Sequence, residues 1–402
     1  MNDAPLEGII VVEMTAVYSG PYAGLILAEL GATVIKVEAP ERPDMTRRTS
    51  PSLDPSGVSP VFYALNRGKR CVALDATTPD GRSALHQMIQ RADVFLHNVR
   101  PSKVAALGVD YPTLEALNDR LIYAAISGYG FEGPDSEVPV YDFVVQAEAG
   151  MVDYQRDLDT GTASLVSQFV VDKSTANAAV QGILAALLVR TRTGRGQRVD
   201  LPMIQVGLHF GWPDMMGVYF GEVDSSWGAM PPHTPLLPAK AFHVLTTSDG
   251  GEIACGPGVP PFDGFALALG RPEWVVDERF AEMKARRVHY LELVEEIRSA
   301  ALQLTTDELM ANFAANDVAA GVVRHRATLH EDDLITRLGL ISEQDAPHVG
   351  KVRQPRPLWT FGTSSTVTTT HIGAVGEDTD AVLRELGIVF GTTPPNSPPN
   401  PV

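Results

Sequence analysis

The first forty residues contain a strand, a helix and a second strand in close succession. Gly8–Glu13 and Thr33–Glu38 are short apolar runs. Between them, Gly20-Pro21 opens a helical stretch over Tyr22–Leu30. A helix that joins two strands within about thirty residues is the crossover connection of a parallel sheet. The chain is therefore predicted to fold as an α/β protein.

The same alternation continues further along the chain. Strands are expected at Cys71–Leu74, Val94–Leu96 and Leu121–Ile126, with a helix at Arg82–Arg91. This pattern predicts a mostly parallel sheet, and such sheets bind ligands at the carboxyl ends of their strands. The first turn, Thr15–Pro21, lacks the G-x-G-x-x-G fingerprint, and the chain has no Walker A motif. A nicotinamide dinucleotide is therefore not indicated.

The chain has 402 residues, which is longer than a domain with a single hydrophobic core usually is. Two domains, or one large domain with an insertion, are therefore expected. Composition changes near Ser225, where several prolines mark an irregular connection. Residues 241–330 then follow a smaller α+β pattern. The tail, residues 392–402, has five prolines among small polar residues and is expected to be disordered.

A long apolar helix begins beside Asp172. Its apolar residues recur at steps of three and four, namely Ala176, Ala179, Val180, Ile183, Leu184 and Leu187. Gly194 follows a last turn that contains Arg190 and Arg192, which is typical of a helix C-terminus. Asp172 is thus placed at the N-terminus, where free N–H groups and the helix dipole favour an ionised carboxylate. It is a candidate nucleophile, and a helix cap is the alternative.

The net charge of −17 argues against nucleic acid and anionic membranes as partners. Residues 1–105 are nevertheless neutral, with 11 basic and 11 acidic side chains. Basic residues cluster there at Arg47-Arg48, Lys69-Arg70 and Arg100 with Lys103. These clusters suit a ligand that carries phosphate groups, and solvated surface charge is the alternative.

Other features narrow the class of protein. No run of about 18 apolar residues predicts a membrane span. The first residues lack the basic start and apolar stretch of a signal peptide, so a cytoplasmic location is expected. Two cysteines, Cys71 and Cys255, provide neither a disulfide framework nor a zinc pattern. The ten histidines show no metal-binding spacing, and His97 and His243 are interpreted as structural, so no metal is expected.

Short motifs along nearly the whole chain carry a family resemblance. They are Ser19-Gly20-Pro21, Leu30–Glu38, Asp44–Arg47, Asn66–Arg70, Asn98–Pro101, Ser127–Gly130, Gly133-Pro134, Tyr141-Asp142, Thr193–Gln197 and Gly376–Leu383. In this order they resemble the family III CoA-transferases, which include formyl-CoA transferase, carnitine CoA-transferase and α-methylacyl-CoA racemase. The resemblance implies a large Rossmann-like domain (1–225), a small domain (226–330), a C-terminal segment (331–391) that returns to the large domain, and an interlocked homodimer.

The resemblance also implies a site, with Asp172 as the nucleophile. The residues it places at coenzyme A (CoA) are Tyr18, Ser19, Leu74, Asp75, Thr77, Asn98, Val99, Arg100, Lys103, Tyr141 and Asp142. Arg100 is expected to contact a CoA phosphate, because a planar cationic fork suits that group. CoA and acyl-CoA enter as substrates, with a carboxylic acid as the acceptor and no permanently bound cofactor.

The family's reaction moves CoA between acids through covalent intermediates on the aspartate. Each step forms an oxyanion that needs hydrogen-bond donors. Glycine turns of the small domain, Asp249–Gly251 or Gly256–Gly258, are candidate donors, and ordinary hairpin turns are the alternative. Acceptor contacts are expected from Arg47–Pro60, from the residues after Gly150 and from Ser225–Pro238.

Several other functions remain as alternatives. The racemase branch carries a histidine before the position of Asp142, where this chain has Tyr141, and no histidine lies between Ser127 and Asp172. An isomerase or an intramolecular CoA transfer would use the same Asp172 chemistry. A non-catalytic acyl-CoA binding protein has no need of that carboxylate, and a dinucleotide oxidoreductase lacks its fingerprint.

Two basic residues common in the family are replaced here by Ala39 and Ala106. Lys103 or Arg42 is expected to compensate in binding CoA. Asp200 follows a predicted strand and is interpreted as the cap of the next helix.

Overall fold

The computed structural model describes residues 3–49, 58–157, 160–215, 242–256, 262–347 and 349–389. The described residues divide into two compact units. The first lies within Met1–Asp153, Leu165–Phe210 and Thr336–Val402, and the second within Tyr154–Ser164 and Gly211–Ile335. The predictions for residues 225–238 and 392–402 concern segments that lie wholly outside the described residues.

A six-stranded parallel sheet forms the centre of the first unit, in the order β3-β2-β1-β4-β5-β6. The strands are β1 (Ile10–Met14), β2 (Thr33–Glu38), β3 (Arg70–Ala73), β4 (Val94–His97), β5 (Ile122–Ser127) and β6 (Gln197–Pro202). The prediction of a mostly parallel α/β sheet is confirmed. The strand order reverses between β1 and β4, which is the switch point where doubly wound sheets open a crevice.

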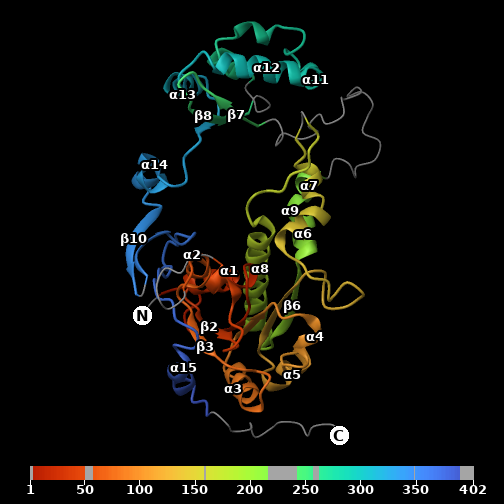
Figure 1. The fold of residues 1–402 in the computed structure, drawn as a ribbon, viewed down its shortest axis with the longest axis vertical. Helices are drawn as coiled ribbons and strands as arrows, with labels where there is room; N and C mark the ends of the chain where they lie inside the picture. Colours follow the sequence, from red (N-terminus) through yellow and green to blue (C-terminus); the bar gives the residue numbers. More distant parts are fainter. Residues whose placement is uncertain are drawn as a thin grey trace. The chain divides into compact units, whose positions relative to one another are not determined.

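Helices cover both faces of this sheet (Figure 1). On one face, α1 (Ser19–Glu29) packs against α8 (Val170–Thr193). The other face carries α3 (Pro79–Ile89), α5 (Tyr111–Leu117) and α15 (Thr379–Glu385). Further helices that include residues of this unit are α2 (Pro60–Asn66), α4 (Pro101–Val104), α6 (Asp142–Glu148), α7 (Met151–Tyr154), α9 (Met203–Met215) and α14 (Asp333–Arg337).

The α8 helix ends as its sequence predicts, at Gly194 in the left-handed conformation (φ 74°). Arg190 lies in the last turn and pairs with Asp93. The predicted apolar stripe is buried except for Leu184, which is exposed because the core-facing stripe runs through Ala186 instead. The helix therefore packs along the sheet through its buried stripe.

The C-terminal part of the first unit holds a hairpin and a helix. The hairpin pairs β10 (Ile341–Ala346) with β11 (Gly350–Pro355) and was not predicted. Beyond it, Asp378 and Thr379 accept the N–H groups of Cys71 and Ala73 at 2.7 and 3.0 Å. The edge strand β3 is thereby covered, which protects its free backbone groups from pairing with another chain.

The second unit is built on an antiparallel sheet in the order β7-β8-β9. Its strands are β7 (His243–Thr246), β8 (Glu252–Cys255) and β9 (Ala320–Val322). Its helices are α10 (Phe262–Ala268), α11 (Met283–Val288), α12 (Tyr290–Ala301) and α13 (Thr306–Ala315). Phe265, Trp274 and Phe313 are buried in one core. Within the described ranges, no helix combines the length and apolar character that crossing a bilayer requires.

Candidate active site

A cavity of about 220 Å³ lies at the switch point of the parallel sheet. Its walls come from the segments that follow β1, β4 and β5 and from the loop before α6. The lining residues are Ala16, Val17, Ser19, Asn98, Val99, Arg100, Pro101, Ile126, Ser127, Gly128, Ser136, Val138, Pro139, Val140, Tyr141 and Met203. The cavity is thus where the strand pattern predicts a ligand.

Asp172 is the third residue of α8 and is only 7% exposed. It does not cap its own helix. Asp142 does so, because its Oδ2 accepts the N–H groups of Val171 and Asp172 at 2.7 and 3.0 Å. The capping role that was the alternative for Asp172 belongs to Asp142, and the Asp172 carboxylate is left for other contacts.

The expectation that Asp172 stays firmly ionised is wrong. Burial, together with the like charge of Asp142, raises the pKa of Asp172 to about 7. Hydrogen bonds from the side chain and backbone of Ser19 oppose this rise. Ser19 opens α1, so the N-termini of α1 and α8 meet at this carboxylate. Burial and the Asp142 charge outweigh the hydrogen bonds from Ser19, and the sequence pattern did not reveal this.

Aromatic side chains stand beside this carboxylate. The rings of Tyr18 and Phe169 are 4.7 Å apart, and Phe169 is the residue just before α8. The charge of Asp172 contributes to the raised pKa of Tyr18, after burial. The Asp172 carboxylate therefore lies in surroundings that exclude much of the solvent.

Some cations of the predicted basic clusters are paired with carboxylates, and one lines the cavity. Arg47 is buried and forms a two-bond pair with Glu38, at 3.0 and 2.6 Å. Lys69 is buried against Glu13, and Arg70 pairs with Glu385 of α15. These side chains stabilise the fold and are not available to a ligand. Arg100, by contrast, lines the cavity, is exposed and forms no ion pair with any described residue.

Comparisons with known proteins identify the family of this chain. The family model for "CoA-transferase family III" matches residues 6–379. The chain belongs to that family. A succinate–glutarate CoA-transferase from Agrobacterium fabrum is 32% identical over 87% of this chain and 88% of its own length. A formyl-CoA:oxalate CoA-transferase from Escherichia coli is 28% identical over 95% of this chain and 96% of its own. Homologues are named CoA-transferases, and this chain is an enzyme of the family III CoA-transferase type.

A solved structure extends the comparison to the fold. A CaiB/BaiF family protein from Brucella suis superposes with a TM-score of 0.79 and 30% identity, over 96% of this chain and all of that one. The family III fold is thus shared along nearly the whole chain.

Five of the residues that the resemblance placed at CoA line the cavity of this family III enzyme: Ser19, Asn98, Val99, Arg100 and Tyr141. The other six do not. Tyr18 packs on Phe169, and Asp142 caps α8. Leu74 is buried under α3, Asp75 and Thr77 form the turn before that helix, and Lys103 lies on α4. The roles of all eleven stay predictions.

Ala39 and Ala106, which replace basic residues of the family pattern, each have an arginine nearby. Ala39 and Arg42 form a β-bridge, and Arg42 lowers the pKa of Asp75 as a minor contribution after the hydrogen bonds from Thr77. Arg42 therefore stands at the carboxyl ends of β2 and β3, close to Ala39. Beside Ala106, the guanidinium of Arg82 donates to the Ala106 carbonyl at 2.9 Å. Sequence reasoning did not single out Arg82.

Sequence reasoning also missed part of the cavity wall of this CoA-transferase. Val17 lines the cavity with φ at 73°, a conformation that a valine rarely adopts and that no sequence pattern signals. Ser127 and Gly128 belong to a matched motif, which is the signal that was available for them. Glu137 holds the loop before α6 by accepting the N–H of Ser102 at 2.5 Å.

The remaining polar candidates are structural. His97 is fully buried and its Nε2 lies 2.8 Å from the Tyr123 hydroxyl, while burial lowers its pKa to about 3. His243 contacts the Tyr290 hydroxyl at 2.8 Å. Asp200 lies inside β6 and pairs with Arg198, so the cap predicted for it is wrong. In the part of the chain that the structure describes, no group of three or more His, Cys, Asp or Glu side chains is arranged to hold a metal.

Proposed function

We propose that this enzyme moves CoA from an acyl-CoA thioester to a carboxylic acid, with Asp172 as the covalent nucleophile. The observation that carries the proposal is a buried carboxylate at two helix N-termini, hydrogen-bonded by Ser19 beside a cavity at the sheet's switch point. A carboxylate is a weak nucleophile, and fixed placement with little water is what makes it effective.

The first half of the reaction loads CoA onto the enzyme. An Asp172 oxygen attacks the thioester carbonyl carbon, the carbon–sulfur bond breaks, and CoA leaves as a thiolate from a mixed anhydride. The thiolate then attacks the aspartyl carbonyl carbon. The anhydride carbon–oxygen bond breaks, the donor acid leaves as a carboxylate, and an aspartyl-CoA thioester remains.

The second half delivers CoA to the acceptor. The acceptor carboxylate attacks the aspartyl carbonyl and expels the CoA thiolate, which forms a new anhydride. The thiolate attacks the acceptor's carbonyl, and the Asp172 carboxylate is released. Ser19 stabilises the carboxylate that begins and ends the cycle, because it donates to Asp172 from both its hydroxyl and its backbone.

The cavity is where we place CoA. We place Arg100 at a phosphate of CoA because it lines the cavity, whereas the predicted cations Arg47, Lys69 and Arg70 are paired with carboxylates. Arg42, next to Ala39, is the candidate to replace the basic residue that the family pattern has there. The acyl groups of the donor and acceptor are proposed to be those of small carboxylic acids, because relatives are named for succinate and glutarate and for formyl-CoA and oxalate.

Intact-protein mass spectrometry with a panel of acyl-CoAs tests the nucleophile. Succinyl-, glutaryl- and formyl-CoA are added to the wild-type enzyme, to Asp172→Ala and to Asp200→Asn, which changes a carboxylate outside the cavity. We expect an adduct on the wild type and on Asp200→Asn that hydroxylamine removes and that maps to Asp172. Its absence from every protein, with CoA still bound, would contradict the proposal. Exchange of α-protons into deuterated water would then test the racemase or isomerase alternative.

We also propose that the enzyme is the homodimer implied by the family resemblance. Light scattering on a size-exclusion column should give twice the mass of one chain. A monomer at micromolar concentration would overturn this proposal without affecting the assignment of Asp172.

A further inference from the structure

The segment between β1 and α1 has an unfavourable backbone conformation at one residue. Val17 has φ at 73° and is, with Asp317, one of the two non-glycine residues with positive φ among those described. A β-branched side chain disfavours this left-handed region strongly. Such a conformation persists only where surrounding contacts impose it, and it is found most often at functional sites.

Three consecutive residues of this segment are held through their backbone by side chains from elsewhere. Lys36 Nζ donates to the Thr15 carbonyl at 2.9 Å. Asn98 accepts from the Ala16 N–H at 3.0 Å and donates to the Ala16 carbonyl at 2.8 Å. Asp44 Oδ1 accepts from the Val17 N–H at 3.2 Å. Of these contacts, the one with Asp44 is made to the strained residue itself.

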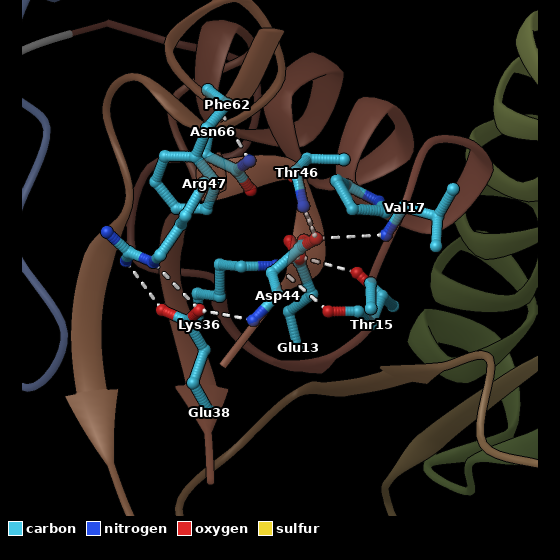
Figure 2. Close-up of polar contacts among 12 residues, drawn as sticks. Glu13, Thr15, Val17, Lys36, Glu38, Asp44, Thr46, Arg47, Phe62 and Asn66 are labelled. Carbon is cyan, nitrogen blue, oxygen red and sulfur yellow. Dashed lines mark hydrogen bonds and ion pairs between the residues drawn. The ribbon is translucent and has the colours of Figure 1, made fainter. Parts of the chain in front are cut away.

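Asp44 is in turn fixed by a buried cluster of charges, shown in Figure 2. Its Oδ2 pairs with Lys36 Nζ at 3.1 Å, and its Oδ1 accepts from the Thr46 N–H and hydroxyl at 3.0 and 2.7 Å. The Asp44 N–H donates to Glu38. Asp44 is 4% exposed and Lys36 is fully buried. A carboxylate with this many partners is ionised and has a single orientation.

The same cluster reaches the first turn of α1. Lys69 Nζ donates to the Pro21 carbonyl at 2.7 Å and pairs with Glu13. The Thr15 side chain fills the space where a Cβ on Gly20 would stand, at 2.5 Å. The segment is therefore anchored on both sides of Val17 and Tyr18, and Ser19 begins α1 directly after them.

We infer that Asp44 is a positioning residue for the reaction centre. By binding the N–H of Val17, it imposes the left-handed conformation that turns the chain from β1 into α1. That turn sets where Ser19 presents its two donors to Asp172, and it shapes the cavity wall at Ala16 and Val17. Asp44 touches no reacting atom itself. The consequence for Asp172 rests on the function proposed above, whereas the effect on Val17 does not.

The neighbouring contacts explain why this role falls to Asp44. Lys36 and Asn98 hold Thr15 and Ala16 in a course that does not by itself require φ to be positive at the next residue. Thr46 orients the same carboxylate oxygen that Val17 uses, so it acts through Asp44. Glu38 binds the Asp44 backbone and Arg47, and it has no contact with Val17 among the described residues.

The test is a double-mutant cycle between Asp44→Asn and Val17→Gly. Glycine accepts positive φ without strain, so it removes the need for an imposed conformation. If Asp44 acts by holding Val17, the two substitutions are coupled. Asp44→Asn then changes the exchange and labelling rates much less when residue 17 is glycine. If Asp44 only supports the fold as the partner of Lys36, the two effects add. Glu29→Gln is the matched control, since it breaks another buried ion pair, with Arg67, at the far end of α1.

The first measurement is amide hydrogen exchange of the free enzyme, followed by mass spectrometry of a peptide spanning residues 14–25. We expect Asp44→Asn to speed exchange in this peptide about tenfold, Glu29→Gln to leave the amides of residues 15–19 unchanged, and Val17→Gly to reduce the Asp44→Asn effect to about twofold. Additive effects, or unchanged exchange in Asp44→Asn, overturn the inference.

The second measurement is the rate at which succinyl-CoA, or whichever acyl-CoA labels the wild type, forms the hydroxylamine-sensitive adduct. We expect Asp44→Asn to slow labelling about tenfold, with little change in the dissociation constant for free CoA. In the Val17→Gly background, Asp44→Asn is expected to slow labelling much less. If no acyl-CoA labels even the wild type, the proposed function fails while the exchange cycle still decides the role of Asp44. If Asp44→Asn does not fold, Thr46→Val replaces it, with a smaller effect expected in the same direction.

Discussion

Asp142 both caps the helix that carries Asp172 and raises the pKa of the Asp172 carboxyl. One oxygen of Asp142 accepts two N–H groups at the start of α8, so the carboxylate cannot move away from its neighbour. Its charge adds to the effect of burial on Asp172. The two carboxylates that the sequence placed in separate motifs therefore act as one electrostatic unit.

The acylation rate of the wild-type enzyme is expected to rise with pH around neutrality. In the proposed reaction only the ionised form of Asp172 attacks a thioester, and its pKa of about 7 leaves much of it protonated below that pH. Labelling by an acyl-CoA should therefore be half-maximal near pH 7 and level off about one to two units higher. Rapid-quench labelling between pH 5.5 and 9 measures this, with roughly half-unit steps. A rate that is flat over the whole range contradicts the raised pKa.

Replacing Asp142 tests the electrostatic coupling separately. Asp142→Asn keeps an oxygen that can accept the N–H groups of Val171 and Asp172 but removes the like charge. The midpoint of the labelling profile is then expected to move to lower pH. A midpoint that stays in place would mean that burial alone sets the pKa of Asp172. Circular dichroism checks that α8 is still formed.

Removing the Asp172 charge should stabilise the protein at alkaline pH. The pKa of Asp172 is raised from 3.8 to about 7, so the folded state binds its proton more tightly than the unfolded state. The free energy of unfolding therefore falls as pH rises from about 4 to about 7 because of this group. Asp172→Asn is expected to raise the free energy of unfolding at pH 8 by about 1–4 kcal/mol. Urea titrations at pH 8 and at pH 4, where the gain should vanish, measure it.

Arg100 is expected to contribute to CoA affinity through a phosphate. Arg100→Ala should weaken CoA binding about tenfold, while Arg91→Ala, an exposed cation just beyond the end of α3 and outside the cavity lining, should change it less than about threefold. Calorimetry with CoA and with pantetheine, which lacks the phosphates, separates charge from shape. Equal losses for both ligands would show that Arg100 only shapes the cavity. Arg42→Ala, measured in the same way, decides whether Arg42 compensates for Ala39.

Gly24 is expected to be essential for the packing of α1 over the buried charges. A Cβ at Gly24 would lie 1.9 Å from Glu13 Oε2 and 3.0 Å from Lys69 Nζ. Gly24→Ala should therefore lower the free energy of unfolding by about 2–4 kcal/mol, despite the gain of about 1 kcal/mol in helix propensity. Gly182→Ala in α8 is the control, because its Cβ meets only the Val199 side chain, at 2.9 Å. A denaturant series that ranks the two variants in the opposite order contradicts this account.

Most of the parallel sheet followed from local patterns. The predicted strand Thr33–Glu38 agrees with β2 at both ends. The β10–β11 hairpin was missed because its strands, with Ser342, Gln344, Lys351 and Arg353, are too polar to show an apolar alternation. Leu184 was wrongly assigned to the core because helical spacing does not tell which of two adjacent stripes faces the sheet.

The sequence by itself determined the α/β class, the family and the position of Asp172 at a helix N-terminus. Apolar strand segments, helix ends and short motifs each depend on residues that are close together in the sequence. Only the tertiary structure decided the electrostatics of the site. Burial and the charge of Asp142, thirty residues away, raise the pKa of Asp172. Likewise, Arg47 and Lys69 were candidates for ligand binding until packing against Glu38 and Glu13 paired them. Charge and solvation depend on which groups meet in space, and no local pattern encodes that.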